Sequence, residues 1–344
     1  MDIWEYGVNM DELKSSVRIN RFDNLKGLAI FLIVLGHLSF ITELDSINLI
    51  HNYIYLIHLP IFFFVAGYFS KIGPDEPLKA FKRLLLPFII FCIIWELFSV
   101  FVLGNAPTKL LFIDPGYALW FLISLFTMKM ILPILDKFRY PLLISFILAL
   151  LIGFTDASVL GISRTFVFMP VFLVGFYYKE YQQKLNGFSA LKILEKNISV
   201  IIIFILTIIS CIIVAFYVDF YAIILKNPYT GFNIFEIVIR AIIIILGIVN
   251  VLCLNRLMTN NKTILTKFGK NSLAVYIFHV YIVKVIRPFI KPYFIHHEKL
   301  FIIFILTVSF VIVYVLSRDW VSKFLNKLIE FVYDRIVDGK KLLE

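Results

Sequence analysis

The sequence predicts an all-α membrane protein of about ten transmembrane helices. Hydrophobic residues make up 61% of its 344 residues, whereas charged residues make up only 16%. Soluble domains are about 45–50% apolar and about 25% charged, so a water-soluble fold could not bury this much apolar surface. The apolar residues are also grouped into segments long enough to cross a bilayer as helices. We therefore expect a polytopic membrane protein with little soluble mass.

Ten apolar segments follow one another along the chain, most of them roughly 15–22 residues long. Their expected ranges are 25–41, 47–70, 84–103, 118–135, 140–155, 165–178, 198–217, 233–254, 271–290 and 300–317, with the fifth and sixth the shortest. Residues 1–317 are expected to form one membrane domain, and residues 318–344 a cytoplasmic tail. The first 20 residues contain no apolar core of a cleavable signal peptide, so the first span should act as its own signal.

Basic residues predict the orientation of these segments. Of the 33 lysines and arginines, 25 lie in the N-terminal segment, in every second loop or in the tail, and only six lie in the opposite loops. Loops that remain in the cytoplasm carry such an excess of Lys and Arg. Both termini are therefore expected in the cytoplasm. The same pattern explains the net charge of +10 without a nucleic-acid partner.

The tail has the pattern of an amphipathic helix. Its apolar residues recur at helical spacing: Trp320, Val321, Phe324, Leu325, Leu328 and Val332. A helix of this kind lies in the membrane interface with its apolar face toward lipid. The cysteines Cys92, Cys211 and Cys253 all fall within apolar segments without metal-ligand spacing. We expect no disulfide and no bound metal.

Five ionisable residues lie near the middle of five different apolar segments: His37, His58, Glu96, Arg240 and His279. A charged side chain at this depth costs about 2.5–3.5 kcal/mol even on insertion scales, so such residues usually face a cavity or a partner. Together they predict a polar internal site.

Local explanations exist for some of them. A neutral histidine can bond to a carbonyl across a helix interface, and Glu236 lies one helical turn from Arg240. Pro60 frees a backbone carbonyl that could accept a hydrogen bond from His58. Glu96 has no comparable explanation.

His37 has the residue type and depth of a general base. It follows Lys26 by three helical turns, so the two side chains share one face of the predicted helix. Burial keeps an imidazole neutral, as a base must be, and a nearby carboxylate can orient it. This chemistry suits activation of a hydroxyl for acyl transfer, and it also suits proton relay in a transporter.

The sequence contains no dinucleotide fingerprint, P-loop, zinc-protease motif or nucleophile elbow. A charged donor would therefore have to be bound by scattered basic residues. The stretch KAFKRLLLPF supplies Lys79, Lys82 and Arg83 at the inner end of the third segment. These could hold the phosphates of a coenzyme A thioester, or they could simply flank the span on its cytoplasmic side.

Several stretches together resemble the membrane acyltransferase-3 family, closest in phrasing to its fucose 4-O-acetylase-like branch. They are RFDNLKGLAIFLIVLGH (21–37), HLPIFFFVAGYF (58–69), KRLLLPF (82–88), ALWFL (118–122) and GKNSLAVYIFH (269–279), and they occur in the family's order. In the first stretch, ten residues separate Lys26, where many members have Arg, from His37. Ten spans is also the architecture of that family.

The resemblance implies transfer of an acetyl group from cytoplasmic acetyl-CoA to a hydroxyl of a carbohydrate, such as a capsule, O-antigen, teichoic-type or exopolysaccharide sugar. It implies His37 as the essential catalytic residue and Arg83 as part of the donor site. The given sequence has no SGNH esterase-like domain after its last span, as some members have. Direct transfer to a lipid-linked or polymeric glycan is therefore expected.

These interpretations assign roles to named residues. Catalysis is assigned to His37 as general base or transient acetyl acceptor, with Glu96 or His58 orienting it or shuttling protons. Donor binding is assigned to Lys26, Lys82 and Arg83, and acceptor binding to Asp23, Trp120, Arg240, Tyr276 and His279. Acetyl-CoA is a substrate, with no permanent cofactor, and the protein is expected in the plasma membrane of a bacterium or archaeon. A transporter or flippase of a lipid-linked sugar, using the same buried groups, is the alternative.

Overall fold

Each of the ten predicted apolar segments coincides with a helix. The computed structural model describes residues 19–39, 45–107, 112, 118–156, 159–185, 197–294 and 297–337, and these ranges contain helices and no strand. Eight helical segments are long and apolar enough to cross a membrane. They are α2 (Asn20–Ser39), α3 (Asp45–Tyr68), the continuous segment α4–α5 (Glu76–Phe101), α8 (Ile162–Leu185), α9 (Asn197–Tyr217), α11 (Ile234–Leu257), α13 (Ser272–Phe294) and α14 (Glu298–Leu316).

Two further apolar helices are shorter: α6 (Trp120–Leu135) and α7 with its 3₁₀ extension (Pro141–Phe154). At 1.5 Å per residue, the 16 residues of α6 reach about 24 Å, less than the roughly 30 Å of a hydrocarbon core. The expectation that the sixth segment is among the shortest is wrong, because α8 has 24 residues. The short segments are instead the fourth and fifth. Eight spans are thus supported by length, and ten stays a prediction.

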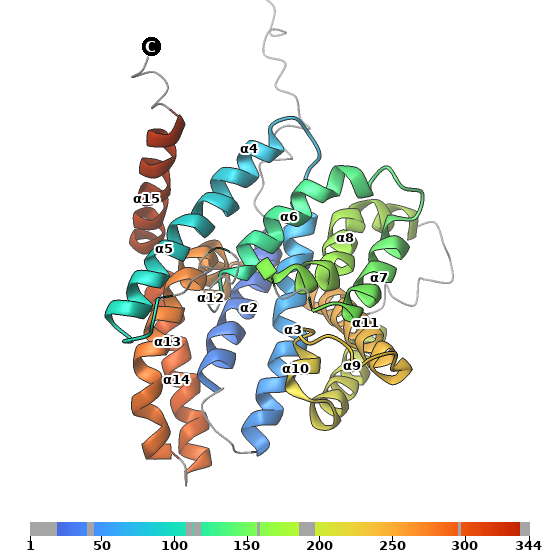
Figure 1. Cartoon of the computed structure of the whole chain (residues 1–344). Coiled ribbons are helices and arrows are strands. Elements are labelled where there is room, and N and C mark those ends of the chain that lie inside the picture. The colour runs from blue at the N-terminus through green and yellow to red at the C-terminus, as the bar shows by residue number, and fades with distance from the viewer. Residues whose placement is uncertain are drawn as a thin grey trace, which may run out of the picture.

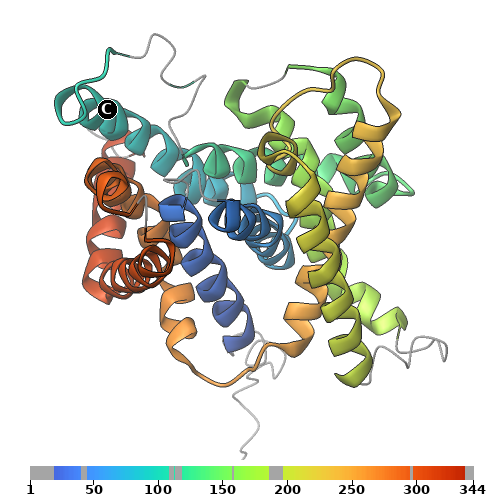
Figure 2. The same cartoon turned by 90° about the horizontal axis from the view of Figure 1, so that it is seen from below.

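Helices α2 and α3 occupy the middle of the bundle (Figures 1 and 2). Helix α2 contacts α3, α13, α14 and the short helix α12 (Ile264–Lys270), whereas α3 contacts α8, α9 and α11. Figure 2 shows α13 to α15 on one side of this central pair and the helices from α7 to α11 on the other. Residues on α2 and α3 are therefore enclosed by helices that come from both halves of the chain.

Glycines allow α3 and α8 to approach each other closely. A Cβ atom at Gly67 of α3 would lie 1.9 Å from the carbonyl oxygen of Phe172 in α8. Reciprocally, a Cβ atom at Gly175 of α8 would lie 2.0 Å from the carbonyl oxygen of Phe64. Small residues at a crossing bring two backbones into van der Waals contact, which is a main source of helix association in lipid. This contact fixes the position of α3 and its polar side chains.

Asn24 joins the first turns of α2 to α12 and the loop before it. Its side chain is fully buried, and its amide donates to the carbonyl oxygens of Thr259 (2.9 Å) and Asn261 (3.0 Å). Its Oδ1 accepts from the hydroxyls of Thr263 (2.8 Å) and Thr266 (2.6 Å). Every polar atom of this amide is therefore satisfied, as a buried amide requires.

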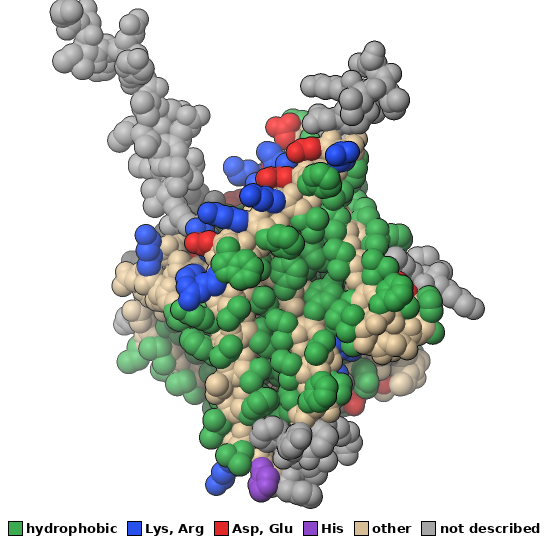
Figure 3. Space-filling model, turned by 90° about the vertical axis from the view of Figure 1, so that its left-hand side faces the viewer, with side chains coloured by type: hydrophobic (Ala, Val, Ile, Leu, Met, Phe, Trp, Pro, Cys, Tyr) green, Lys and Arg blue, Asp and Glu red, His purple; other side chains and the backbone are tan. Residues whose placement is uncertain are grey.

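Charged side chains gather at one end of the molecule. Figure 3 shows hydrophobic side chains over most of the visible face and Lys, Arg, Asp and Glu along its upper end. A wide apolar belt with charge concentrated at one end fits a chain that crosses a bilayer. The sequence predicts that this end faces the cytoplasm.

The described part of the tail forms α15 (Asp319–Val337), which packs against α13 and α5. Its apolar residues divide between two faces: Val321, Leu325 and Ile329 are buried, whereas Trp320, Phe324, Phe331 and Ile336 are exposed. The amide of Asn271 donates to the carboxylate of Asp319 (2.9 Å) and to the carbonyl oxygen of Ser317 (2.7 Å). This hydrogen bond is the first cause that holds the pKa of Asp319 below its ordinary value. The tail is therefore an amphipathic helix with a fixed start, and its interfacial location stays a prediction.

Candidate functional site

The basic residues at the start of the third apolar segment lie within a wide helical turn or just before it. Helix α4 (Glu76–Ala80) continues through a π-helical turn (Phe81–Leu85) into α5 (Leu86–Phe101), and the amide of Leu86 donates to the carbonyl oxygen of Phe81, five residues back. Pro87 has no N–H to give to the carbonyl of Arg83, so the regular α-helical bond cannot form there. Such π-turns are frequent at functional sites because they change the direction of side chains.

The three basic residues of the stretch KAFKRLLLPF, namely Lys79, Lys82 and Arg83, differ in where their side chains lie. Arg83 and Lys79 line a cavity of about 390 Å³. Lys82 lies away from the cavity lining, with its ammonium nitrogen 4.4 Å from the centre of the Tyr333 ring in α15. The geometry thus favours Lys79 and Arg83 as anion-binding residues and gives Lys82 a contact with the tail.

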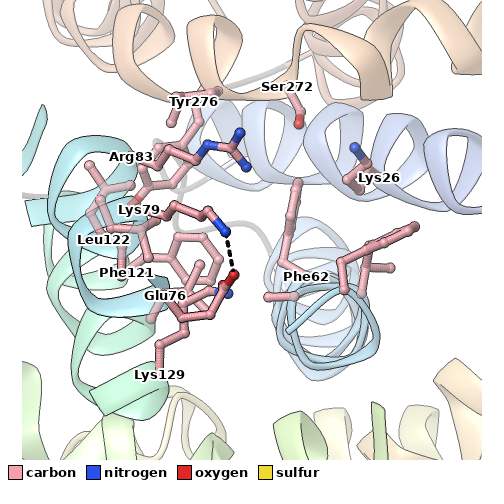
Figure 4. A pocket seen from close by; sticks show the side chains of 17 residues that line it. Lys26, Phe62, Glu76, Lys79, Arg83, Phe121, Leu122, Lys129, Ser272 and Tyr276 are labelled. Atoms are coloured by element: carbon pink, nitrogen blue, oxygen red, sulfur yellow. Dashed lines mark hydrogen bonds and ion pairs between the residues drawn. The ribbon is translucent and has the colours of Figure 1, made fainter. Parts of the chain in front are cut away.

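The cavity lies between α2, α3, α4–α5, α6 and α13, and its lining is strongly basic (Figure 4). Four cationic side chains line it: Lys26, Lys79, Arg83 and Lys129. Glu76 is the one acidic residue of the lining among those that the structure describes. Its apolar wall includes the rings of Phe62, Phe69, Phe121 and Tyr276. A concave site with cationic side chains on a low-dielectric wall concentrates anions.

Two of the four cations have carboxylate partners. The ammonium of Lys26 lies 2.9 Å from the carboxylate of the buried Asp23, and that of Lys79 lies 3.0 Å from the carboxylate of Glu76. Lys129 donates to the hydroxyl of Ser70 at 3.0 Å, which adds no negative charge. The cavity therefore keeps a surplus of positive charge, as a phosphate-bearing ligand would require. The sequence analysis did not identify Lys129, because it counted this lysine only as a loop charge.

Two histidines from opposite ends of the chain meet between α2 and α13, two of the helices that line the cavity. Nδ1 of His37 in α2 lies 3.0 Å from Nε2 of His279 in α13, and the two rings stack with centroids 5.1 Å apart. Nδ1 of His279 lies 2.9 Å from the carbonyl oxygen of Val275. His279 is completely buried, whereas His37 is partly exposed.

The carbonyl of Val275 decides which nitrogens carry protons. Because a carbonyl only accepts, the neutral ring of His279 carries its proton on Nδ1 and presents a lone pair on Nε2. Nδ1 of His37 must then donate to that lone pair. The lone pair of His37 is consequently on Nε2, which makes this nitrogen the basic one.

Tyr276 connects the cavity to the histidine pair. Its ring lines the cavity, and its centroid lies 6.2 Å from that of His279. Its hydroxyl donates to the carbonyl oxygen of Ala118, just before α6. Lys26 and His37 similarly share α2. Helices α2 and α13 therefore contribute both to the cavity lining and to the histidine pair.

His58 lies near this pair but bonds within its own helix. Its Nδ1 is 2.6 Å from the carbonyl oxygen of Ile54. The expectation that His58 pairs with the carbonyl freed by Pro60 is wrong. Pro60 has no N–H, so the carbonyl left without its helical partner is that of Leu56, whereas His58 bonds to that of Ile54. Both His58 and His37 flank Tyr55, at ring-centroid distances of 4.8 Å and 6.4 Å.

His51 is a fourth histidine of this region, and the sequence analysis missed it. Its ring lies 4.5 Å from that of Tyr55, and its Nδ1 lies 2.9 Å from the hydroxyl of Ser39 and 3.0 Å from the carbonyl oxygen of Gly36. His51 precedes His58 by seven residues, or two helical turns, so both occupy one face of α3. That spacing was a signal the sequence contained.

Arg240 contacts the loop before α11, and its predicted role in acceptor binding stays a prediction. Its guanidinium donates to the carbonyl oxygen of Asn227 at 2.8 Å and lies 4.8 Å from the centre of the Tyr229 ring. Burial raises the pKa of the Tyr229 phenol. The carboxylate of Glu236 accepts hydrogen bonds from the backbone amide and the hydroxyl of Thr230, so Glu236 bonds to the same loop before α11. Arg240 thus holds the loop before α11, and it is absent from the described lining of the basic cavity.

Two other predicted residues, Trp120 and Glu96, are absent from the described lining of the cavity. Trp120 is buried, and the guanidinium of Arg164 lies 3.8 Å from the centre of its ring. Glu96 is half-buried on α5, where Trp95 packs against Tyr281 of α13. A role of Trp120 in acceptor binding and of Glu96 in catalysis stays a prediction.

A family model described as an acyltransferase domain matches residues 19–318, which is nearly the whole chain. The matched range begins just before α2 and ends just before α15. No curated protein and no solved structure matches the chain.

Proposed function

This chain belongs to the acyltransferase-3 family and is a membrane acyltransferase, and we propose that it transfers acetyl from cytoplasmic acetyl-CoA to a hydroxyl of a cell-surface carbohydrate. The acceptor class comprises capsule, O-antigen, teichoic-type and exopolysaccharide sugars, which are either part of the finished polymer or linked to a lipid. The membrane is the plasma membrane of a bacterium or archaeon, with the basic end of the molecule toward the cytoplasm.

The observation that carries this proposal is that the basic cavity and the His37–His279 pair are built on the same two helices and are linked by Tyr276. The two features share α2 and α13, with Lys26 and Tyr276 in the cavity lining. Coenzyme A is a phosphorylated nucleotide that carries a long, partly apolar arm. Phosphate groups fit cationic side chains, and the arm fits the wall made by Phe62 and Phe121.

In the proposed reaction, Nε2 of His37 removes the proton from the sugar hydroxyl. The oxygen then attacks the thioester carbonyl and forms a C–O bond. Collapse of the tetrahedral intermediate breaks the C–S bond, and the imidazolium of His37 returns the proton to the departing thiolate. His279 accepts the hydrogen bond from Nδ1 of His37 throughout, so it fixes the ring and stabilises its positive form.

A two-step route through the same nitrogen is chemically possible. Nε2 of His37 would attack the thioester first, and the sugar hydroxyl would then attack the acetyl-imidazole. A rapid burst of coenzyme A release before acceptor is added would support this route, and its absence would support direct transfer.

The test compares wild type with His37→Ala and with His297→Ala, each purified in detergent and matched for folding. His297 is an exposed histidine before α14 and serves as the control. With labelled acetyl-CoA and a bacterial glycan extract, we expect loss of about 10²–10⁴-fold in transfer for His37→Ala alone. Unchanged transfer in that variant would refute the catalytic role of His37. Flux of a lipid-linked sugar without any acetyl transfer would favour the transporter.

A further inference from the structure

Lys129 is half-buried and is the one charged residue of helix α6. Its ammonium has three N–H donors, and the one hydrogen bond it makes with a described residue goes to the hydroxyl of Ser70. Within the described residues it has no ion pair with a carboxylate. Placing an ammonium in this position is costly unless an anion also occupies the site.

Two charged residues act on Lys129 with opposite signs. Arg83 acts on it as a like charge, and Glu76 acts on it as an opposite one. Glu76, however, already pairs with Lys79 at 3.0 Å. All four side chains line the same cavity, and Figure 4 shows Lys129 on the side of the Lys79–Glu76 ion pair. Three cations thus face one carboxylate, which leaves two positive charges for a ligand.

We propose that Lys129 and Arg83 hold one phosphate group of the acyl donor, and that Glu76 is the resident counter-ion of this subsite when the donor is absent. The inference rests on the proposed function for the identity of the donor. A phosphate monoester carries about −1.5 to −2 charges at neutral pH, which matches the surplus. Its oxygens would accept from both the Arg83 guanidinium and the two further N–H groups of Lys129.

The experiment measures binding of coenzyme A and of inorganic pyrophosphate to the purified full-length protein by calorimetry. We expect Lys129→Met to weaken coenzyme A binding about tenfold or more, as for loss of one hydrogen bond to a charged group. It should also reduce the dependence of the affinity on salt concentration. Lys129→Arg should restore most of the affinity.

Two further variants sharpen the test. Glu76→Gln should bind coenzyme A more tightly than wild type, because the competing carboxylate is removed. Lys137→Met, which changes an exposed lysine just after the same helix, should bind as wild type. Equal affinity and equal salt dependence of wild type and Lys129→Met would overturn the subsite.

The outcomes separate the subsite from the proposed function. Acetyl transfer that persists with an unchanged KM for acetyl-CoA in Lys129→Met would refute the subsite and leave the acetyltransferase intact. Pyrophosphate binding that depends on Lys129, in a protein that neither binds coenzyme A nor transfers acetyl, would keep the anion subsite and reject the donor. Absence of binding of both probes to wild type would reject both proposals.

Discussion

His37 and His279 are 242 residues apart in the chain, and Nδ1 of one lies 3.0 Å from Nε2 of the other. The bond joins α2 to α13, and the carbonyl of Val275 fixes its direction. His279 therefore belongs with the group that orients His37. This placement goes beyond the acceptor-binding role that the sequence suggested for it.

The first prediction concerns His279. Substitution His279→Ala should lower kcat roughly 10- to 100-fold, the range for partners that orient a functional histidine. Loss of the acceptor for Nδ1 of His37 leaves the ring free to rotate and its positive form less stable. The KM for acetyl-CoA should stay unchanged, because His279 is not part of the cavity lining. A change confined to KM would instead place His279 in substrate binding.

The second prediction separates the two adjacent basic residues of the π-turn. Arg83→Met should raise the dissociation constant for coenzyme A about tenfold or more, because a cationic donor to phosphate is lost. Lys82→Met should leave it near the wild-type value, since Lys82 lies over the ring of Tyr333. Calorimetric titration of both variants is the measurement. Equal weakening by the two would mean that the basic cluster acts only through its total charge.

The third prediction concerns the crossing of α3 and α8. Gly175→Ala should destabilise the protein by about 1–3 kcal/mol, because its Cβ would lie 2.0 Å from the carbonyl oxygen of Phe64 and the helices must separate. The apparent melting temperature in detergent is the readout. Gly73→Ala, in the loop before α4, is a suitable control because its Cβ would meet nothing closer than 4.0 Å. Equal melting of both variants would show that the crossing adjusts without cost.

The fourth prediction is a pH dependence of the start of α15. The hydrogen bond from Asn271 lowers the pKa of Asp319 from its ordinary value of 3.8. A carboxyl with a lowered pKa in the folded state stabilises that state above its unfolded pKa, and the contribution is lost as the pH falls through the folded value. Relative to the intrinsic exchange rate at each pH, amides at the start of α15 should therefore lose protection against solvent exchange below about pH 4.

The variant Asp319→Asn provides the control for that measurement. It should exchange faster than wild type at neutral pH and show less change on acidification. An acid response of the same size in both proteins would mean that another group controls the docking of this helix.

The fifth prediction concerns Arg240. Because its guanidinium holds the carbonyl of Asn227 and the ring of Tyr229, Arg240→Met should lower stability. A buried polar partner left without its hydrogen bond costs about 1–3 kcal/mol. The KM for the sugar acceptor should remain near wild type. A selective rise of that KM at unchanged melting temperature would support the acceptor-binding role predicted from the sequence.

Composition and periodicity were sufficient to predict the all-helical membrane bundle and nearly every helix position. Apolar length determines which segments enter lipid, and this is a local property of the chain. The same reasoning placed His37 at depth on one face with Lys26, because helical geometry relates residues that are close in sequence. It failed for the length of α8, because the charged residues that follow position 178 end an apolar segment without ending a helix.

What the sequence by itself determined is thus the class of the protein and the positions of its apolar helices. Only the tertiary structure decided that His279 is hydrogen-bonded to His37, that Lys129 joins Arg83 in the cavity, and that Arg240 contacts the loop before α11. Depth places residues in one slab of the membrane but leaves the rotation and neighbours of each helix open. Those are set by close contacts such as the glycine crossing of α3 and α8 and the Pro87 π-turn, which act between or within helices and carry no hydropathy signal.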